Sequence, residues 1–507
     1  MFAFARGPRP DIPRRPDPVT AAEQGVGYGR LTGNGLIYAL ANIAPVVTAV
    51  AITPSITRLL GAVEYGVVAT NLVVVQVIGL LATLGLPSAV TRHALIEKSG
   101  MHGAGRLVFD SAVIALGLGA LTAVTSPFWA PLAMSLPWRP AVLWATLAGA
   151  ALSIVTCSQG FLRARAQAWK FVLVAAALSV GAQLGALVLV SQTAKAESYL
   201  AGLSLIYSLI FVALMVDLAT QLRRLPMSST IGWSSDLKSA IGLGLPTLPH
   251  GLSMVLVNGI AVLMASAAEG SRAAGQLQLM LLVGGAPALA LSALNNAWAP
   301  AVYALRDGHR GPSIQRTSRV IALGLSSIVL VVALLAPIAL RLLAPAEQLT
   351  GAPLWSTTII AASALTSLIY LSNVHLVFSA GRTTALAWVT PLSLGASVAC
   401  GYGLMRMIGL AGLASIPLLF YTSQAIAMAV LRRRVSTEHW SERGLVITTA
   451  ATLSALVGTC AIPTSPDSSF LRWSLALLVI LTAAVVLGAA AKDGRRTNAL
   501  EHRDQTD

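Results

Sequence analysis

The stretch Gly244 to Met254, GLPTLPHGLSM, places two prolines and a histidine inside an apolar run that continues to Ala265. Helix-breaking prolines and ionisable side chains are tolerated in the hydrocarbon of a bilayer only where they face protein or a wet cavity. We therefore expect His250 to lie within a membrane-spanning helix and to face the inside of the protein, beside a transport path.

The composition of the whole chain is that of a membrane protein. Of its 507 residues, 56% are hydrophobic and 10% are charged, whereas about a quarter of the residues of a soluble domain are charged. Many separate apolar runs reach the roughly 20 residues that span a bilayer, and they do not alternate as the strands of a β-barrel would. The sequence thus predicts an all-α polytopic membrane protein.

We expect fourteen transmembrane helices. Their approximate ranges are 31–58, 64–91, 106–131, 140–162, 170–192, 198–222, 238–266, 273–301, 316–342, 354–378, 383–405, 410–431, 443–463 and 470–491. These ranges divide the chain into a tail (1–30), a first lobe of six helices (31–222), a second lobe (236–433), an appended pair (442–491) and a second tail (492–507).

The basic residues predict the orientation. The chain has 34 Lys and Arg residues. One lies at each connection on one side, namely Arg58, Arg139, Lys195, Arg272, Arg341, Arg406 and Arg472, and all others lie on the opposite side. Basic residues concentrate in cytoplasmic loops, so both termini are expected in the cytoplasm. This rule also explains the net charge of +15 without a nucleic-acid partner.

An internal repeat is expected with an offset of about 209 residues. A turn carrying Glu64 and then Gly66 follows the first span, and a turn carrying Glu269 and then Gly275 follows the seventh. Because six spans separate the copies, both enter the membrane from the same side. This predicts two six-helix lobes related by a pseudo-two-fold axis along the membrane normal, with a central cavity between them.

Three stretches resemble motifs of a known family. ITRLLGAVEYG (Ile56 to Gly66), LPTLPHGLS (Leu245 to Ser253) and ALNNAWAPAVY (Ala293 to Tyr303) are similar to motifs of the polysaccharide flippases of the multidrug/oligosaccharidyl-lipid/polysaccharide exporter superfamily. Their order and spacing cover spans one to twelve. One departure is the segment after the Pro-His motif, where family members often carry an Asp-Arg pair. This chain has no charge there, and Asn258 is the candidate substitute.

The resemblance implies a transporter rather than an enzyme. It implies an inner-membrane protein of bacteria that moves undecaprenyl-diphosphate-linked oligosaccharides across the bilayer, alongside polysaccharide polymerase and export machinery. The sequence contains no P-loop motif, so we expect no ATP and no bound cofactor, and coupling to an H+ or Na+ gradient or to the membrane potential. The chain's three isolated cysteines show no metal-ligand spacing.

The candidate site residues fall into three groups. Amides and cations that suit a sugar-binding cavity are His250, Asn42, Arg58, Asn258, Asn71, Gln276 and Asn295. Arginines that suit a diphosphate at the entry side are Arg92, Arg163 and Arg382. Residues that suit ion coupling are His250, Asp110, Asp217 and His375.

Each candidate also has a structural explanation. The amides and histidines suit interhelical hydrogen bonds, and the entry arginines suit ordinary membrane anchoring. Arg58 is expected to pair with Glu64 or Glu269. Asp110 is expected to pair with Arg106, and Asp217 with Arg223 or Arg224.

Two alternatives within the superfamily remain, a lipid II flippase and an ion-coupled drug antiporter. The antiporter needs a membrane-embedded carboxylate, and the sequence places none deep in a span. A membrane glycan polymerase or ligase would need a long charged outer loop, and the outer connections are short.

Overall fold

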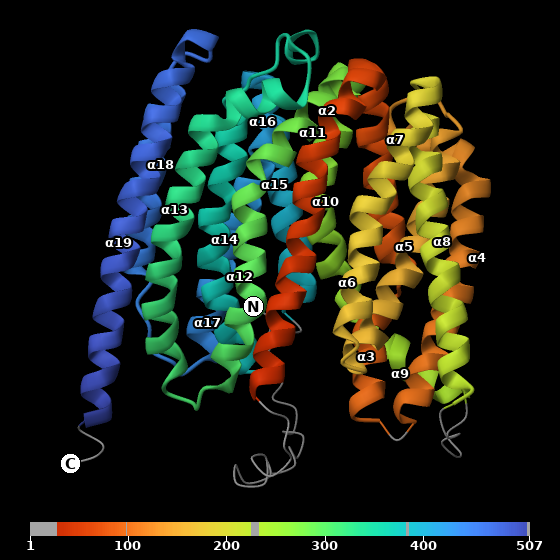
Figure 1. Ribbon diagram of the computed structural model, residues 1–507, viewed down its shortest axis with the longest axis horizontal. Coiled ribbons are helices and arrows are strands. Elements are labelled where there is room, and N and C mark those ends of the chain that lie inside the picture. Colours follow the sequence, from red (N-terminus) through yellow and green to blue (C-terminus); the bar gives the residue numbers. More distant parts are fainter. Residues whose placement is uncertain (1–27, 98, 225–232, 382–384, 504–507) are drawn as a thin grey trace, which may run out of the picture.

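The computed structural model describes residues 28–97, 99–224, 233–381 and 385–503, and within them only the backbone of residues 28–46, 233–235 and 490–503. The secondary structure of these residues is entirely helical (Figure 1). The long helices run in order as α2 (Tyr28–Leu81), α3 (Leu86–Leu95), α4 (Gly100–Met134), α5 (Ala141–Ala164), α6 (Ala168–Ala176), α7 (Ala182–Thr193), α8 (Ala196–Leu222), α9 (Trp233–Gly244), α10 (Leu248–Glu269), α11 (Ser271–Gly284), α12 (Ala286–Ala304), α13 (Arg310–Leu343), α14 (Ser356–Ser379), α15 (Leu386–Ile408), α16 (Leu410–Ala414), α17 (Ile416–Val435), α18 (Arg443–Cys460) and α19 (Ser469–Arg503). Short turns of 3-10 or π-helix join some of them: η1 (Ala177–Gly181), η2 (Leu245–Thr247), η3 (Ala346–Leu349) and η4 (Pro466–Ser468).

The described helices provide eleven or twelve candidate membrane spans, and the number reaches fourteen when the longest is divided at its break and the less apolar α15 is added. Eleven stretches are long and apolar enough to cross a membrane, and the pair α11 and α12, bent by 46°, makes a twelfth. One of the eleven, Val47–Leu95, has 49 residues, which is about 73 Å of helix and twice the length needed. It breaks at Gly61 (φ 71°, ψ 176°), a conformation open essentially only to glycine. α15, with 23 residues, is long enough to be the fourteenth span.

Each bundle is built around one buried helix. α5 packs against α2, α4 and α8 in the first bundle, and α14 packs against α12, α13 and α17 in the second. Both are rich in small residues, so neighbouring backbones approach closely. The predicted fold class, two six-helix lobes with two appended helices, is confirmed.

The two bundles meet at Gly66 and Gly275. A Cβ atom added to Gly66 would overlap the carbonyl oxygen of Ser271, and one added to Gly275 would lie 3.3 Å from the carbonyl oxygen of Ala62. Ser271 follows Ala62 by the same 209 residues that separate the two glycines. Contacts that are reciprocal in this way characterise a two-fold interface, as the repeat predicts.

The last two helices form a hairpin on the outside of the second bundle (Figure 1). Both α18 and α19 pack against α13. Arg472 is buried at the start of α19 and donates to the carbonyl oxygens of Leu334 (2.9 Å) and Ile462 (2.7 Å). The hydrogen bond to Leu334 joins the hairpin to α13, and the one to Ile462 holds the turn of the hairpin.

The turns of the bundles lie at two opposite faces. The turns between α3 and α4, between α12 and α13 and between α17 and α18 lie at the lower face in Figure 1, and those between α13 and α14 and between α18 and α19 lie at the upper face. Because the sequence concentrates its arginines in the first set, we call these the arginine-rich and arginine-poor faces.

Candidate functional site

Polar side chains follow one side of the irregular span α9–α10. α9 passes through η2 into α10, and Pro246 and Pro249 lie at this junction. Neither proline has a backbone N–H to donate, which explains the change of helix type. Thr247 and Asn258 are exposed and His250 is half-buried. Their spacing of 3 and 8 residues places them on one side of the helix.

His250 connects this span to α15. Its Nδ1 atom lies 2.8 Å from the Oγ1 atom of the buried Thr390. The contact orients the imidazole toward α15 of the same bundle while leaving part of the ring accessible. Its predicted position inside the protein is therefore observed, whereas its binding role stays a prediction.

A second polar stripe lies on α12. Ser292, Asn296 and Tyr303 are exposed, and their spacing of 4 and 7 residues places them on one face. Exposed polar groups are unfavourable against lipid, so such a face is expected to line a polar path. α2 packs against both α10 and α12, so both stripes lie on neighbours of α2.

His375 on α14 contacts α12 beside this stripe. It is buried on α14, and its Nε2 atom lies 3.0 Å from the Oδ1 atom of Asn295. The amide oxygen can only accept, so Nε2 donates, and Nδ1 of the neutral ring accepts from the Tyr303 hydroxyl at 3.1 Å. The ring also meets Trp298 edge-on, with 4.9 Å between centroids. Two predicted site residues, Asn295 and His375, are thus brought together.

The two candidate coupling aspartates lie in the first bundle. Asp217 accepts from Lys170 at 2.8 Å and from Gln221 Nε2 at 2.6 Å. The expected pairing of Asp217 with Arg223 or Arg224 is wrong, because Lys170 on α6 lies closer. Asp110 is half-buried on α4, and its role in coupling stays a prediction.

Two hydrogen bonds between the bundles, supported by two within the second bundle, close the arginine-poor face. The Thr57 hydroxyl donates to the Leu343 carbonyl (2.5 Å), and Gln348 Nε2 donates to the Thr57 carbonyl (2.6 Å). The buried Gln276 donates from Nε2 to the carbonyls of Gln348 (2.8 Å) and Thr350 (3.1 Å). We call Thr57, Gln276 and Gln348 the seam latch. In this latch, Gln276 holds the segment of Gln348 in position for its contact with Thr57.

Arg58 lies next to the seam latch. It is exposed, and its Nη2 atom lies 3.4 Å from the Leu342 carbonyl oxygen. The expected pairing of Arg58 with Glu64 or Glu269 is wrong for the described residues, because Arg58 forms no ion pair with either and a different arginine engages Glu64.

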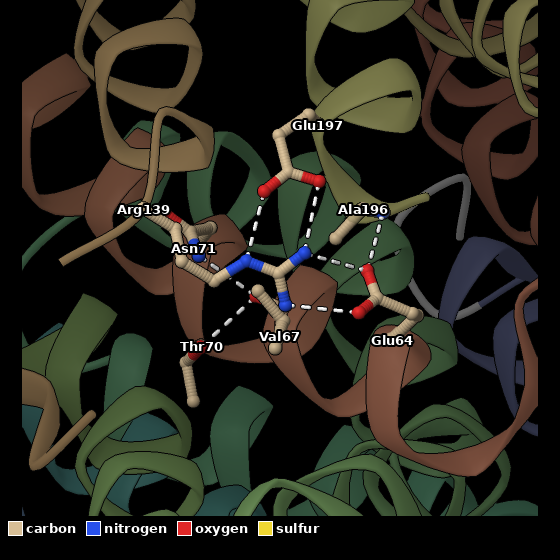
Figure 2. A network of polar contacts seen from close by, with 7 residues as sticks. All are labelled: Glu64, Val67, Thr70, Asn71, Arg139, Ala196 and Glu197. Atoms are coloured by element: carbon tan, nitrogen blue, oxygen red, sulfur yellow. Dashed lines mark hydrogen bonds and ion pairs between the residues drawn. The ribbon is translucent and has the colours of Figure 1, made fainter. Parts of the chain in front are cut away.

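That arginine is Arg139, which joins three turns of the first bundle (Figure 2). It bonds both carboxylate oxygens of Glu64 (2.9 and 3.0 Å) and both of Glu197 (2.8 and 2.9 Å). Glu64 also accepts from the backbone N–H of Ala196 at 2.8 Å. The hydrogen bonds to Glu64 and Glu197 raise the pKa of Arg139 above its usual value. The network fixes the arginine-poor end of the first bundle.

Asn71 lies on α2 near this network (Figure 2). It is buried, and its Nδ2 atom donates to the Val67 carbonyl of its own helix at 2.8 Å. Its Oδ1 atom has no hydrogen-bond partner among the described residues. The side chain of Asn42 lies outside the described residues, so its place in a sugar-binding cavity stays a prediction.

Two of the three predicted entry arginines lie on helices of the first bundle, α3 and α5, and not on α10 or α12, which carry the two stripes. Arg92 is exposed on α3 and pairs with Glu97 at 3.1 Å. Arg163 is exposed at the end of α5, with its guanidinium carbon 5.8 Å from the Phe171 ring centroid. Arg382 lies outside the described residues.

Solved transporter structures share this fold. An inward-facing multidrug resistance MATE family transporter of the MOP superfamily is 16% identical over 82% of this chain and 99% of its own, with a TM-score of 0.58. The lipid II flippase MurJ in an inward closed conformation is 11% identical over 89% and 98%, also with a TM-score of 0.58. A MATE transporter of Vibrio cholerae is 14% identical over 80% and 96%, with a TM-score of 0.55. At these identities the similarity establishes the fold alone.

Sequence comparisons give no closer assignment. No protein-family model matches the chain, and no curated protein matches it. The structure and its neighbours define a multi-pass membrane protein with a MATE- and MurJ-like transporter fold.

Several residues that contact the predicted site residues were not singled out from the sequence. Thr390 and Gln348 carried no signal, because serine, threonine and glutamine are scattered through many spans. Trp298 and Tyr303 did carry one, since both stand in the stretch Ala293 to Tyr303. Arg139 was visible only as one of several isolated basic residues in outer connections.

Proposed function

We propose that the protein is a flippase that moves undecaprenyl-diphosphate-linked oligosaccharide units from the cytoplasmic to the periplasmic leaflet of the bacterial inner membrane. The observation that supports this most is the exposed polar stripe Ser292, Asn296 and Tyr303 on a membrane-spanning helix. Hydroxyls and amides both donate and accept hydrogen bonds, which suits the many hydroxyls of a sugar. The stretch Ala293 to Tyr303, which resembles a polysaccharide-flippase motif, includes Asn296 and Tyr303 of this stripe.

The proposed path runs beside α2, with His250 and Asn258 on one flank and the α12 stripe on the other. The arginine-rich face is assigned to the cytoplasm by the distribution of basic residues, so both termini lie there. The diphosphate enters past Arg92, Arg163 and Arg382 while the polyprenyl chain stays in lipid.

Alternating access then requires the seam latch to open. In the described conformation the hydrogen bonds of Thr57 with Leu343 and Gln348 hold the bundles together at the arginine-poor face, and Gln276 holds the Gln348 segment in place within the second bundle. Rocking of the bundles breaks these few hydrogen bonds and exposes the path to the periplasm. Interhelical hydrogen bonds in membranes contribute about 0.6 kcal/mol each, so such a latch is easily reversed.

The energy source is proposed to be an ion gradient or the membrane potential. His250 and His375 are the proposed proton-responsive groups, because each contacts a neighbouring helix through a ring nitrogen. Asp217 suits this role less, since Lys170 already neutralises it. The ion pair of Asp217 also disfavours the drug antiporter, which needs an available carboxylate. A lipid II flippase is distinguished by the deletion experiment below.

The test is deletion of the gene, followed by analysis of surface glycans and of lipid-linked intermediates. We expect loss of one surface polysaccharide and accumulation of its undecaprenyl-diphosphate-linked repeat unit on the cytoplasmic side, both reversed by the wild-type gene. Normal glycans with raised drug sensitivity would overturn the proposal in favour of an antiporter. Accumulated lipid II with arrested wall synthesis would assign the protein to peptidoglycan instead.

A further inference from the structure

Five exposed arginines lie where the second bundle meets the α18–α19 hairpin at the arginine-rich face. They are Arg316 and Arg319 near the start of α13, Arg433 and Arg434 at the end of α17, and Arg443 at the start of α18. We call this group the arginine surface.

The loop between α17 and α18 brings these arginines together. Glu438 accepts from the backbone N–H groups of Gly308 (2.6 Å) and Gly311 (2.9 Å), so the loop is held against the start of α13. The Ser441 N–H donates to Gln315 Oε1 at 3.3 Å. A Cβ atom on Gly444 would lie 3.2 Å from Arg319 Nε, so Arg319 packs against the first turn of α18.

The nearby carboxylates are already engaged by other groups. Glu438 caps the start of α13, Asp307 bonds Arg310 (2.6 Å), and Glu442 bonds Arg432 (2.8 Å). Glu442 reaches Arg433 at only 3.8 Å. Arg316, Arg319, Arg434 and Arg443 form no ion pair within the described part of the chain.

This arrangement crowds positive charge. Arg319 lies beside the residue that follows Arg443, at the N-terminal end of α18, where the helix dipole is also positive. Like charges at short range disfavour one another. A bound anion would remove this penalty, and phosphate suits it because the guanidinium fork matches phosphate oxygens.

The apolar neighbours of the arginine surface identify the source of the phosphate. Val320 directly follows Arg319 and is 43% exposed, and Ile447 lies one turn beyond Arg443 and is 58% exposed. A soluble phosphate would leave these side chains uncovered, whereas a lipid places acyl chains on them directly below its headgroup. The arginine surface also lies at the ends of three spans, which is the depth of lipid headgroups.

We propose that the arginine surface binds the phosphate headgroup of an anionic phospholipid, such as phosphatidylglycerol, in the leaflet that it faces. The lipid bridges α13 and α18 and so fastens the hairpin to the second bundle. This proposal does not depend on which substrate the transporter moves.

The test titrates short-chain phosphatidylglycerol into the purified full-length protein in neutral detergent and follows thermal unfolding. Phosphatidylcholine and sodium pyrophosphate at matched ionic strength serve as the two reference ligands. The variants are Arg319→Gln with Arg443→Gln, the exposed single variant Arg316→Gln, and a control, Arg223→Gln with Arg224→Gln. The control removes two exposed charges from the end of α8 at the same face of the first bundle.

We expect phosphatidylglycerol to raise the unfolding temperature of the wild type and of the control, and phosphatidylcholine to have little effect. Each arginine near an anionic headgroup contributes about a fivefold gain in affinity. The Arg319/Arg443 double variant should therefore bind about 25-fold more weakly, and Arg316→Gln about fivefold. Should the double variant not fold, the single variant decides. Equal binding by all variants, or an equal effect of pyrophosphate and phosphatidylglycerol, would overturn the proposal.

Discussion

Gly66 and Gly275 lie against each other at the seam between the two bundles, and each occupies the repeat position of the other. A Cβ atom on Gly275 would lie 3.2 Å from the backbone nitrogen of Gly66. Two equivalent residues can touch only where the axis that relates them passes between them. The pseudo-two-fold axis that relates the two bundles therefore runs through this contact, at a point where no side chain intervenes.

The first prediction concerns Gly66→Ala. The added methyl group would overlap the backbone carbonyl of Ser271, which cannot rotate away as a side chain could. We expect the bundles to separate at the arginine-poor face, with a loss of about 1–3 kcal/mol typical of overpacking. The measurement is thermal unfolding of the purified protein together with complementation of the deletion strain.

Gly117→Ala is the matched control for that substitution. Gly117 lies within α4, and an added Cβ there meets nothing within 4 Å. It should leave stability unchanged or raise it by up to about 1 kcal/mol, as alanine does in a helix. Equal behaviour of the two variants would show that the seam contact is looser than described.

The second prediction concerns the seam latch. Gln348→Leu removes the side-chain donor to the Thr57 carbonyl and leaves the backbone carbonyl of residue 348, which accepts from Gln276, in place. We expect the arginine-poor face to open more often, with a shift of about 0.6–2 kcal/mol between conformations. The measurement is the labelling rate of a cysteine placed at Ser271, in a background without Cys157, Cys400 and Cys460.

Labelling should accelerate about threefold or more in Gln348→Leu, since about 1.4 kcal/mol corresponds to a factor of ten. The same cysteine with Gln183→Leu, a change inside the first bundle, should react at the wild-type rate. Unchanged labelling in Gln348→Leu would remove the latch from the proposed cycle.

The third prediction concerns Arg139→Gln. The substitution leaves Glu64 and Glu197 facing each other without the cation that both of them bond. Charged hydrogen bonds contribute about 1.5–3 kcal/mol each, reduced here because all three side chains are about a quarter exposed. We expect a loss of about 1–3 kcal/mol, measured by thermal unfolding in detergent.

Neutralising the carboxylates should restore part of that loss. Arg139→Gln combined with Glu64→Gln and Glu197→Gln has no like-charge contact left, so it should be more stable than Arg139→Gln alone. If the triple variant is the least stable of the series, repulsion between the carboxylates is not the cause.

The fourth prediction concerns His375 and Asn295. Because His375 Nε2 donates to Asn295 Oδ1, His375→Ala and Asn295→Ala should not be additive in stability. A double-mutant cycle should give a coupling of about 0.5–1.5 kcal/mol. Tyr303→Phe removes the hydrogen bond from the Tyr303 hydroxyl to His375 Nδ1 and keeps the edge-on packing of the two rings. Additive effects within about 0.3 kcal/mol would indicate that the hydrogen bond contributes little.

The fifth prediction separates the imidazole of His250 from its hydrogen bond. Thr390→Val removes the partner 2.8 Å from Nδ1 and keeps the shape of the side chain, whereas His250→Ala removes the ring. If the ring contacts the substrate, His250→Ala should reduce complementation about tenfold or more and Thr390→Val much less. Full complementation by normally expressed His250→Ala would exclude the ring from the transport path.

The sequence by itself determined the fold class, because bilayer physics leaves long apolar helices as the main solution for such a composition. The repeat offset also paired Gly66 with Gly275, but only the structure showed that the two glycines are in contact. His250 and Asn295 could be singled out because polar groups are rare enough in spans to be noticed individually.

Only the tertiary structure decided the partners of these residues. Arg139 lies 75 residues from Glu64 and 58 from Glu197, and His375 lies 80 residues from Asn295. Hydrophobic periodicity fixes which residues are helical but does not fix the rotation of one helix against another. That rotation determines which polar atoms come into contact. As a result, Glu64 pairs with Arg139 instead of Arg58. In the same way, Asp217 pairs with Lys170 instead of an arginine at the end of its own helix.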